Sequence, residues 1–477
     1  MIPLMTSDPD QYYKIPFSFY ESSFIDASNA VAQALSTSTQ FNMKLYNVFT
    51  TAYHIYINTI SEYNKSWKDL SELDKVLRSK FLNALDEKFR EGDFVSTLSE
   101  TVAASSQLAK IAGYGKIYKY LSNMLSVWNN DFIDPIRNTL FRTPSEKVCE
   151  IEKYSLFRYD KTFANTADEK ASGSIEQNNT PVLVIYAFIN RDYILDLLPE
   201  ISVIRSLLNQ GLDIFATDWG TPSIYDKSLT ISHFINRYLD KSVDFIRKVT
   251  KSDKVSLFGY CWGGSLALMY AALHPEKVKN LVTIATPGDF DLDDSLLATW
   301  TKAIKSNYLL DAFGNLPGIV LNAAFILRNP IEYGHKYFHF FEQPRSLESV
   351  AQFFAIETWL YDSPPIIGEI YRQFVEDCYK RNLLIKNKMR IGGPYNDNGN
   401  SDTVINLKKI NMPFLNILAK KDDLVAPNSS KALNDVLTES HEKDLIEHDS
   451  GHVGLMIGKR AQKELWPKVG VWLKKRS

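Results

Sequence analysis

VSLFGYCWGGSLAL, residues 255–268, is the stretch that decides the fold of this chain. Its apolar beginning predicts a buried strand, its end predicts a helix, and Gly259, Gly263 and Gly264 mark a sharp turn between them. Glycines suit this turn because larger side chains would clash where the strand meets the helix. The pattern is that of the turn Gly-x-Ser-x-Gly, which presents a nucleophile, with cysteine in place of serine. Cys261 is therefore the candidate nucleophile, although the pentapeptide alone also fits a buried, unreactive cysteine.

The rest of the chain supplies a candidate acid. Residues 412–418 are short and apolar and predict a late buried strand, which two aspartates follow, Asp422 and Asp423. Enzymes with this strand–turn–helix nucleophile carry the acid after a later strand and the histidine after the acid. We expect Asp422 to be the acid because it lies three residues before the apolar Val425, which would anchor the loop. Asp423 is expected to be a solvated loop charge or a helix cap.

Two histidines follow the last predicted strand, residues 443–447. His452 lies in Gly-His-Val-Gly, where the glycines allow close approach, whereas His448 is expected to end the strand or to face solvent. A histidine base needs a carboxylate on one ring nitrogen, so that the other nitrogen can accept the proton of the nucleophile. Asp422 and His452 follow consecutive strands, and the predicted catalytic residues are therefore Cys261, Asp422 and His452.

Strand and helix patterns alternate along the middle of the chain. Amphipathic runs predict helices at residues 197–210 and 231–249, and unbroken apolar runs predict strands that are buried on both faces. This β-α-β-α-β order predicts an α/β fold with a right-handed, doubly wound, mostly parallel sheet. The predicted strands in this part of the chain are residues 181–186, 212–217, 254–258 and 280–285.

These patterns divide the chain into four segments. Residues 1–150 are an N-terminal helical region, residues 151–286 and 411–477 are two parts of the core, and residues 287–410 are a helical insertion between two core strands. Because the insertion is rich in aromatic residues, we expect it to be a lid over Cys261. Aromatic residues of the N-terminal region recur at helical spacing, which fits a self-packed bundle or a docking surface for a partner helix or a hydrophobic particle.

Composition excludes several classes of protein. The chain has 477 residues, and its 54 basic and 56 acidic side chains give a net charge of −2, which argues against a nucleic-acid partner. Three cysteines, Cys149, Cys261 and Cys378, are too few for a disulfide framework and favour a reducing compartment. No cluster of cysteine and histidine has metal-ligand spacing, so no metal or other cofactor is expected. No signal peptide is expected, because the N-terminus lacks a basic region followed by an apolar core. No membrane-spanning segment is expected either, because the longest apolar stretch, residues 316–327, is short and interrupted.

The chain resembles the polyhydroxyalkanoate (PHA) synthases, and the two-subunit, class III type looks closest. The resemblance runs from about Arg142 to the C-terminus, and it implies the α/β-hydrolase fold with a helical lid. A cysteine in the nucleophile turn together with the run Asn-Arg-x-Tyr-x-Leu-Asp-Leu is its most specific part. The stretches that carry it are residues 189–197, 218–220, 259–264, 270–275, 314–318 and 451–454.

The resemblance implies acyl transfer, with Cys261 as nucleophile, Asp422 as acid and His452 as base. The implied substrate is an (R)-3-hydroxyacyl-CoA, with 3-hydroxybutyryl-CoA as the expected monomer. The chain would form an acyl-cysteine, release CoA and extend a growing polyester. The main-chain N–H groups of Trp262 and Phe188 would hold the oxyanion that develops in each transfer.

The resemblance also implies partners and a location. We expect a homodimer at the surface of cytoplasmic polymer granules. A second synthase subunit is a further expected partner, but the N-terminal third is longer than in the two-subunit catalytic chains, which leaves the need for that subunit open.

Two other functions stay open on the sequence alone. One is a cysteine-nucleophile hydrolase of the same fold, either a thioesterase or an enzyme of the dienelactone hydrolase kind, which would release free acid instead of polymer. The other is a non-catalytic scaffold that coats granules. The presence of Cys261, Asp422 and His452 together argues against the scaffold.

Overall fold

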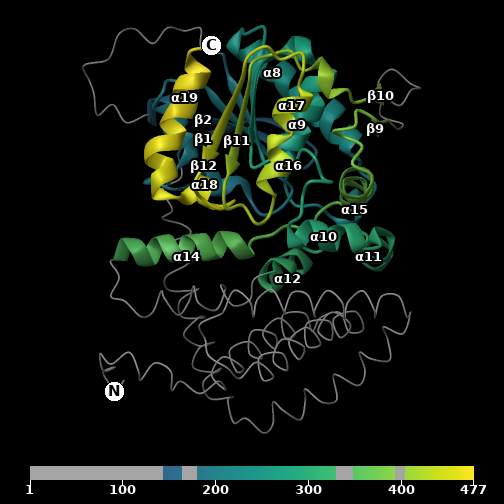
Figure 1. Cartoon of the computed structure of the whole chain (residues 1–477). Coiled ribbons are helices and arrows are strands. Elements are labelled where there is room, and N and C mark those ends of the chain that lie inside the picture. Colours follow the sequence, from purple (N-terminus) through teal and green to yellow (C-terminus); the bar gives the residue numbers. More distant parts are fainter. Residues whose placement is uncertain (1–142, 164–179, 329–346, 393–402) are drawn as a thin grey trace, which may run out of the picture. The chain divides into compact units, whose positions relative to one another are not determined.

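The computed structural model describes residues 143–163, 180–328, 347–392 and 403–477, which are drawn in colour in Figure 1. The predicted helices between residues 24 and 140 lie outside the described residues, as does most of the polar loop before residue 180.

An eight-stranded sheet forms the centre of the described chain. Its strand order is β1-β2-β6-β3-β7-β8-β11-β12, and all neighbours from β6 to β12 are parallel. The predicted doubly wound, mostly parallel sheet is therefore confirmed. The six parallel strands are β3 (Val182–Ile185), β6 (Ile214–Asp218), β7 (Val255–Tyr260), β8 (Val278–Ile284), β11 (Phe414–Ala419) and β12 (Lys443–His448).

Two further strands at one edge of the sheet did not show in the sequence pattern. β1 (Ser145–Ile151) pairs antiparallel with β2 (Tyr154–Tyr159), and β2 pairs antiparallel with β6. β1 is an edge strand with charged, largely exposed side chains, so it lacks the apolar run that marks the central strands. β1 begins at Ser145, whereas the sequence pattern places the start of the core at residue 151.

Helices cover both faces of the sheet (Figure 1). α7 (Val203–Leu208) packs with α19 (Trp466–Lys474), while α8 (Asp240–Thr250) and α9 (Trp262–Leu273) pack on β7. α7 is shorter than the helix expected at residues 197–210. Its first part instead forms the hairpin of β4 (Asp196–Leu198) and β5 (Ile201–Ser202).

A buried carboxylate explains the hairpin before α7. Asp196 Oδ1 accepts hydrogen bonds from the hydroxyl groups of Thr143 and Ser202, and its Oδ2 accepts one from the Thr143 N–H. A buried carboxylate needs such donors, and a continuous helix would not bring these donors to it.

The chain between β8 and β11 leaves the strand–helix alternation. Its longer helices lie together beyond one end of the sheet, as Figure 1 shows for α10, α11, α12 and α14. Two short strands, β9 (Arg390–Ile391) and β10 (Thr403–Val404), pair near its end. The helices of this insertion are α10 (Leu296–Ala303), α11 (Ser306–Phe313), α12 (Gly318–Arg328), α14 (Leu347–Tyr361), α15 (Gly368–Gln373) and a π-helix (Phe374–Lys380).

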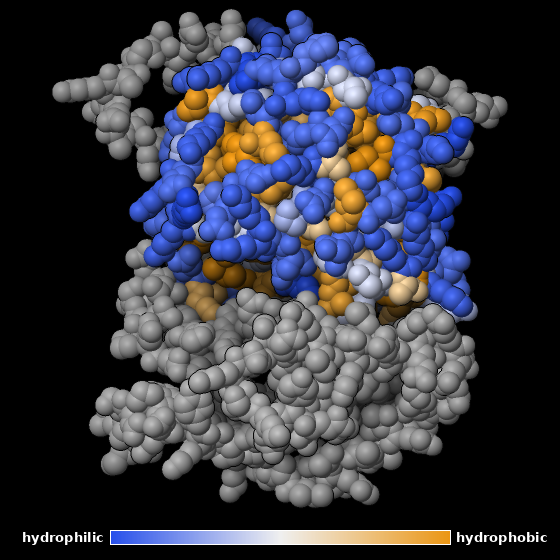
Figure 2. Space-filling view, viewed as in Figure 1, coloured by the Kyte–Doolittle hydropathy of each residue, from blue (hydrophilic) through white to orange (hydrophobic). Residues whose placement is uncertain are grey.

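The visible surface is mainly polar. Figure 2 shows hydrophilic residues over most of the described face, with apolar residues in separate patches among them. In the described part of the chain, no helix has both the length and the apolar character needed to cross a membrane.

Candidate active site

Cys261 lies at the junction between β7 and α9. It precedes the first residue of α9 and has φ 53° and ψ −126°, a conformation that residues other than glycine rarely adopt. The residues on both sides of it are buried, whereas Cys261 itself is partly exposed. The strained turn therefore presents the thiol at the carboxyl end of β7, as expected for a nucleophile.

The glycines around Cys261 allow α9 to approach the neighbouring strands closely. A Cβ atom on Gly263 would lie 2.1 Å from the carbonyl oxygen of Ile185, at the end of β3. A Cβ atom on Gly264 would lie 1.8 Å from Oγ1 of Thr286, just after β8. Real side chains cannot approach so closely, so these glycines determine how deeply the turn sits between the two strands.

Asp422 lies in the turn after β11 with its carboxylate held from two sides. Oδ1 accepts hydrogen bonds from the N–H groups of Leu424, at 3.0 Å, and Val425, at 2.9 Å. Oδ2 lies 2.8 Å from Nδ1 of His452. Val425 is buried and so anchors the loop. The sequence favoured Asp422 because it lies three residues before this apolar residue.

Asp423 points elsewhere. Its side chain is about half exposed, at 53%, and its Oδ1 lies 2.6 Å from Nη1 of Arg328, the last residue of α12. The structure therefore brings Asp422, and not its neighbour, to His452.

His452 is buried between two acidic groups. Burial alone lowers the pKa of its imidazole, but the charge of Asp422, the charge of Cys261 and hydrogen bonds to both raise it, with a net pKa of about 10. Because Nδ1 faces Asp422, Nε2 is the ring nitrogen left for the thiol. Tyr260 packs against the imidazole, with ring centroids 5.0 Å apart, and its hydroxyl donates to the His452 carbonyl at 3.4 Å.

His448 does not join this group. It is the last residue of β12, as expected, but it is buried instead of facing solvent, and its Nδ1 lies 3.0 Å from Oγ of Ser450.

The two candidate oxyanion donors come from different elements. Trp262 is the first residue of the twelve-residue helix α9, and Phe188 lies in the loop after β3. Neither main-chain N–H has a hydrogen-bond partner within the described residues. Helix N-terminal N–H groups such as that of Trp262 have no partner inside the helix and favour negative charge.

The other two cysteines lie away from this site. Cys149 is in β1 at the sheet edge, opposite Leu156. Cys378 is buried in the insertion with its sulfur 4.0 Å from that of Met389, and burial raises the pKa of its thiol well above the ordinary value. Within the described ranges, no group of three or more His, Cys, Asp or Glu side chains has the arrangement of a metal site.

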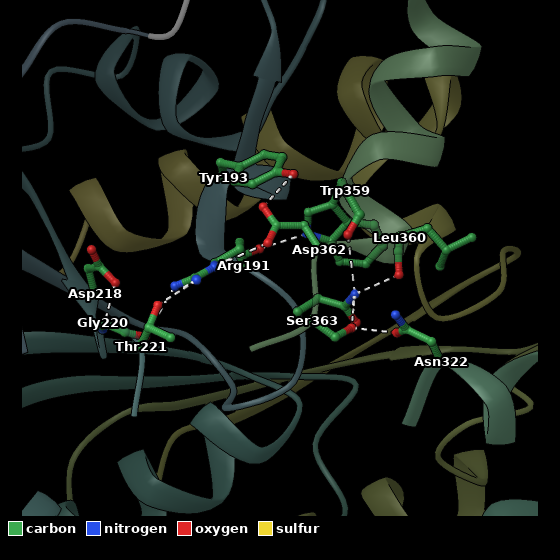
Figure 3. A network of polar contacts seen from close by, with 11 residues as sticks. Arg191, Tyr193, Asp218, Gly220, Thr221, Asn322, Trp359, Leu360, Asp362 and Ser363 are labelled. Atoms are coloured by element: carbon green, nitrogen blue, oxygen red, sulfur yellow. Dashed lines mark hydrogen bonds and ion pairs between the residues drawn. The ribbon is translucent and has the colours of Figure 1, made fainter. Parts of the chain in front are cut away.

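The loop after β3 also anchors the insertion, a task that the sequence did not reveal (Figure 3). Nδ2 of Asn190 donates to the carbonyl groups of Trp359 and Leu360, at 3.2 and 3.0 Å, and to Oγ of Ser363 at 2.9 Å. The indole Nε1 of Trp359 donates in return to the carbonyl of Arg191 at 2.7 Å. These contacts tie the end of α14 to the core.

A second set of contacts in Figure 3 converges on Asp362, just after α14. The hydroxyl of Tyr193 donates to Oδ2 of Asp362 at 3.2 Å, and the Arg191 guanidinium lies 3.5 Å from Oδ1. Arg191 also donates to the Gly220 carbonyl and to Oγ1 of Thr221, at 3.1 and 2.7 Å. The run Asn-Arg-x-Tyr, noted in the sequence only through a resemblance, thus joins three parts of the chain.

Comparisons with known proteins identify the fold and the family of the chain. The family described as alpha/beta hydrolase fold matches residues 180–459. The chain is 37% identical over 335 residues to the poly(3-hydroxyalkanoate) polymerase subunit PhaC of Allochromatium vinosum, a match that covers 70% of this chain and 89% of that protein. It is 36% identical over 341 residues to the protein of the same name from Synechocystis sp., covering 70% and 85%.

Among solved structures, a soluble variant of monoglyceride lipase from Saccharomyces cerevisiae matches 72% of this chain and 97% of its own, with 14% identity and a TM-score of 0.45. The two polymerase relatives are similar over most of their own length, and the match to the hydrolase family includes Cys261, Asp422 and His452. The chain has the α/β-hydrolase fold and belongs to the poly(3-hydroxyalkanoate) polymerase family.

Proposed function

We propose that this chain is an acyltransferase that polymerises (R)-3-hydroxyacyl-CoA, with 3-hydroxybutyryl-CoA as the preferred monomer, into a polyester. The observation that carries the proposal is the hydrogen-bonded pair of Asp422 and His452 beside a cysteine on a strained turn, in a chain of the polymerase family. Cys261 is the nucleophile, His452 the base and Asp422 the acid that orients it.

The first half-reaction transfers the acyl group from CoA to Cys261. Nε2 of His452 takes the thiol proton, the sulfur attacks the thioester carbonyl carbon, and the negative charge moves to the carbonyl oxygen. The N–H groups of Trp262 and Phe188 hold this oxyanion. The bond from carbon to the CoA sulfur then breaks, CoA leaves with the proton from His452, and an acyl-cysteine remains.

The second half-reaction extends the polyester. The hydroxyl of another 3-hydroxyacyl group attacks the acyl-cysteine carbonyl while His452 accepts its proton, and the bond to the Cys261 sulfur breaks. An ester forms and the thiol recovers the proton from His452. The raised pKa of His452 supports this role, because Asp422 stabilises the imidazolium that both half-reactions require.

Water must be kept from the acyl-cysteine, since hydrolysis would release free acid. We assign this task to residues 287–410 as a lid over the core formed by residues 151–286 and 411–477. The lid segment supplies Trp359, Ile366 and Phe374, all buried, to the neighbourhood of the loop after β3. Excluding water strengthens the electrostatic interactions of the site as well as protecting the intermediate.

The lid must move for substrate to enter. Phe188, Trp219 and Ile366 are among the residues that line a pocket beside the oxyanion donor, and its volume is about 30 Å³. Sites for ligands of ordinary size occupy roughly 300–1,000 Å³. This pocket is too small for an acyl-CoA, and its lining does not include Cys261. We propose that the contacts between the loop after β3 and the insertion open to admit the substrate.

The proposal also covers the partners of the chain and its location in the cell. The relatives are named as subunits, which supports a second subunit as partner, and the product is an insoluble polymer, which supports a place at the granule surface in the cytoplasm. A homodimer and an association role for residues 1–150 complete the proposal.

Purified protein incubated with 3-hydroxybutyryl-CoA tests the proposal. We expect release of CoA together with an insoluble polyester, and loss of both in Cys261→Ala. Release of CoA with free 3-hydroxybutyrate and no polymer would identify a thioesterase instead. Absence of any CoA release, with and without a second subunit, would favour a non-catalytic scaffold.

A further inference from the structure

Phe374 is a lid residue that contacts the side chains of both candidate oxyanion donors. It is fully buried at the start of the π-helix Phe374–Lys380. Its ring stacks on the indole of Trp262, with centroids 4.1 Å apart and planes inclined by only 1°. The same ring meets Phe188 edge-on, with centroids 6.4 Å apart and planes inclined by 73°.

These two neighbours come from separate parts of the core. Trp262 begins α9, and Phe188 lies in the loop after β3. Each residue carries its N–H and its aromatic ring on one backbone unit, so a contact that holds the ring also restricts the N–H. Phe374 is thus a single side chain whose ring contacts the rings of both candidate oxyanion donors.

The rings of Trp262 and Phe188 each make further contacts. Nε1 of Trp262 donates to the hydroxyl of Tyr379 at 3.3 Å, in the same π-helix as Phe374. Phe188 packs on Trp219 and Phe234 of the core, at centroid distances of 5.3 and 5.0 Å. Trp262 is therefore held mainly by the insertion, whereas Phe188 is held by both.

We propose that Phe374 is a positioning residue, which sets the distance between the N–H groups of Trp262 and Phe188 when the lid is closed. The inference rests on the proposed function. Oxyanion donors act only within a narrow range of distance, and loss of one donor costs roughly 10²–10³ in rate. Displacement of a donor without its loss should cost less, about tenfold to 10².

Two reactions of Cys261 separate this role from a general effect on the thiol. Acylation by 3-hydroxybutyryl-CoA passes through an oxyanion, so it depends on the N–H groups. Alkylation by iodoacetamide does not, because the sulfur displaces iodide directly at a saturated carbon. Both reactions require the same thiolate of Cys261. Iodoacetamide is much smaller than the CoA thioester, so a control variant in the same segment must show that altered access through the insertion does not by itself slow acylation. A displaced oxyanion donor should therefore slow the first reaction and leave the second unchanged or faster.

The test measures single-turnover CoA release and iodoacetamide alkylation of Cys261 in the full-length chain and its variants. Phe374→Leu removes the ring but keeps most of the bulk, and Phe374→Tyr keeps the stacked ring. Tyr371→Leu removes a buried ring about one turn earlier in the same segment and serves as the matched control. We expect acylation to fall about tenfold or more in Phe374→Leu, with alkylation unchanged or faster, and near-normal rates in Phe374→Tyr and Tyr371→Leu.

Three results would overturn the inference. Phe374→Leu could acylate at the wild-type rate, it could lose acylation and alkylation in parallel, or Tyr371→Leu could show the same selective loss. A wild-type chain that is alkylated at Cys261 but never acylated would instead overturn the proposed function, and the inference with it.

Discussion

The turn around Cys261 and the insertion over it are held in different ways. The turn is fixed by backbone packing, since Gly263 and Gly264 lie against β3 and β8 where no side chain would fit. The insertion is held at its α14 end by hydrogen bonds from Asn190 and by the ion pair of Arg191 with Asp362, and by aromatic contacts of Phe374 with Trp262. Interlocked backbone cannot shift without breaking the core, whereas such side-chain contacts can open and close. The comparison suggests a rigid nucleophile under a cover that can move.

The largest expected effect comes from removing the thiol of Cys261, the proposed nucleophile. Cys261→Ala should abolish CoA release, because the remaining groups can neither form nor hold the acyl intermediate. Cys149→Ala and Cys378→Ala should keep the wild-type rate in the same assay, since Cys149 lies in the edge strand β1 and the thiol of Cys378 is buried against Met389. Full activity of Cys261→Ala would overturn the assignment of the turn.

Asp422, the proposed acid, is expected to make the next largest contribution to the rate. Asp422→Asn should lower the rate of CoA release by as much as about 10⁴, because the amide can present the wrong tautomer of His452 to the thiol. Asp423→Asn, which only disturbs a partly exposed ion pair with Arg328, should have little effect. Equal losses in the two variants would contradict the loop geometry.

The packing of the turn can be tested through stability. Gly264→Ala would place a Cβ atom 1.8 Å from Oγ1 of Thr286, so we expect the free energy of unfolding to fall by about 1–3 kcal/mol. Gly451→Ala is the matched control, because its Cβ atom would meet only the Lys421 carbonyl oxygen, at 3.5 Å. Chemical denaturation measures both variants. Similar stabilities of Gly264→Ala and Gly451→Ala would argue against a turn around Cys261 that is more rigidly packed than the insertion.

The buried pair of His452 and Asp422 predicts a pH dependence of stability. The pKa of His452 is raised in the fold to about 10, above its ordinary value of 6.5, so the protonated imidazole stabilises the native state. This contribution is complete below about pH 6.5 and is lost as the pH rises to about 10. The stability difference between wild type and Asp422→Asn should therefore shrink across that range in denaturation experiments. A difference that grows with pH would mean that His452 is neutral in the fold.

The smallest expected effect comes from Asn190, which holds the end of α14 in the insertion. Asn190 has φ 57°, which glycine tolerates, so Asn190→Gly should remove three hydrogen bonds to the end of α14 without straining the backbone. We expect a bulky maleimide to label Cys261 severalfold faster in this variant, while a small reagent such as iodoacetamide gains less. Unchanged labelling by both reagents would argue that the cover opens elsewhere.

The sequence by itself predicted the six parallel strands of the sheet and brought forward Cys261, Asp422 and His452, in that order, as the candidate catalytic residues. Strands such as β3 and β7 are buried on both faces, so their apolar runs were visible in the chain. The turn around Cys261 could be predicted because its conformation depends on residues next to it in the sequence. Asp422 could be chosen over Asp423 because it lies three residues before Val425.

Only the tertiary structure decided the edge strands, the hairpin before α7 and the contacts of the insertion. β1 is charged and largely exposed, and its pairing depends on β2 and not on a pattern of its own. Asp196 breaks the expected helix through donors from Thr143, and Asn190 reaches Ser363 across 173 residues. Hydrophobic periodicity and residue spacing depend on interactions between residues that are close in the sequence. Contacts such as the stacking of Phe374 on Trp262 depend on which distant surfaces meet, and that becomes known only when the chain is folded.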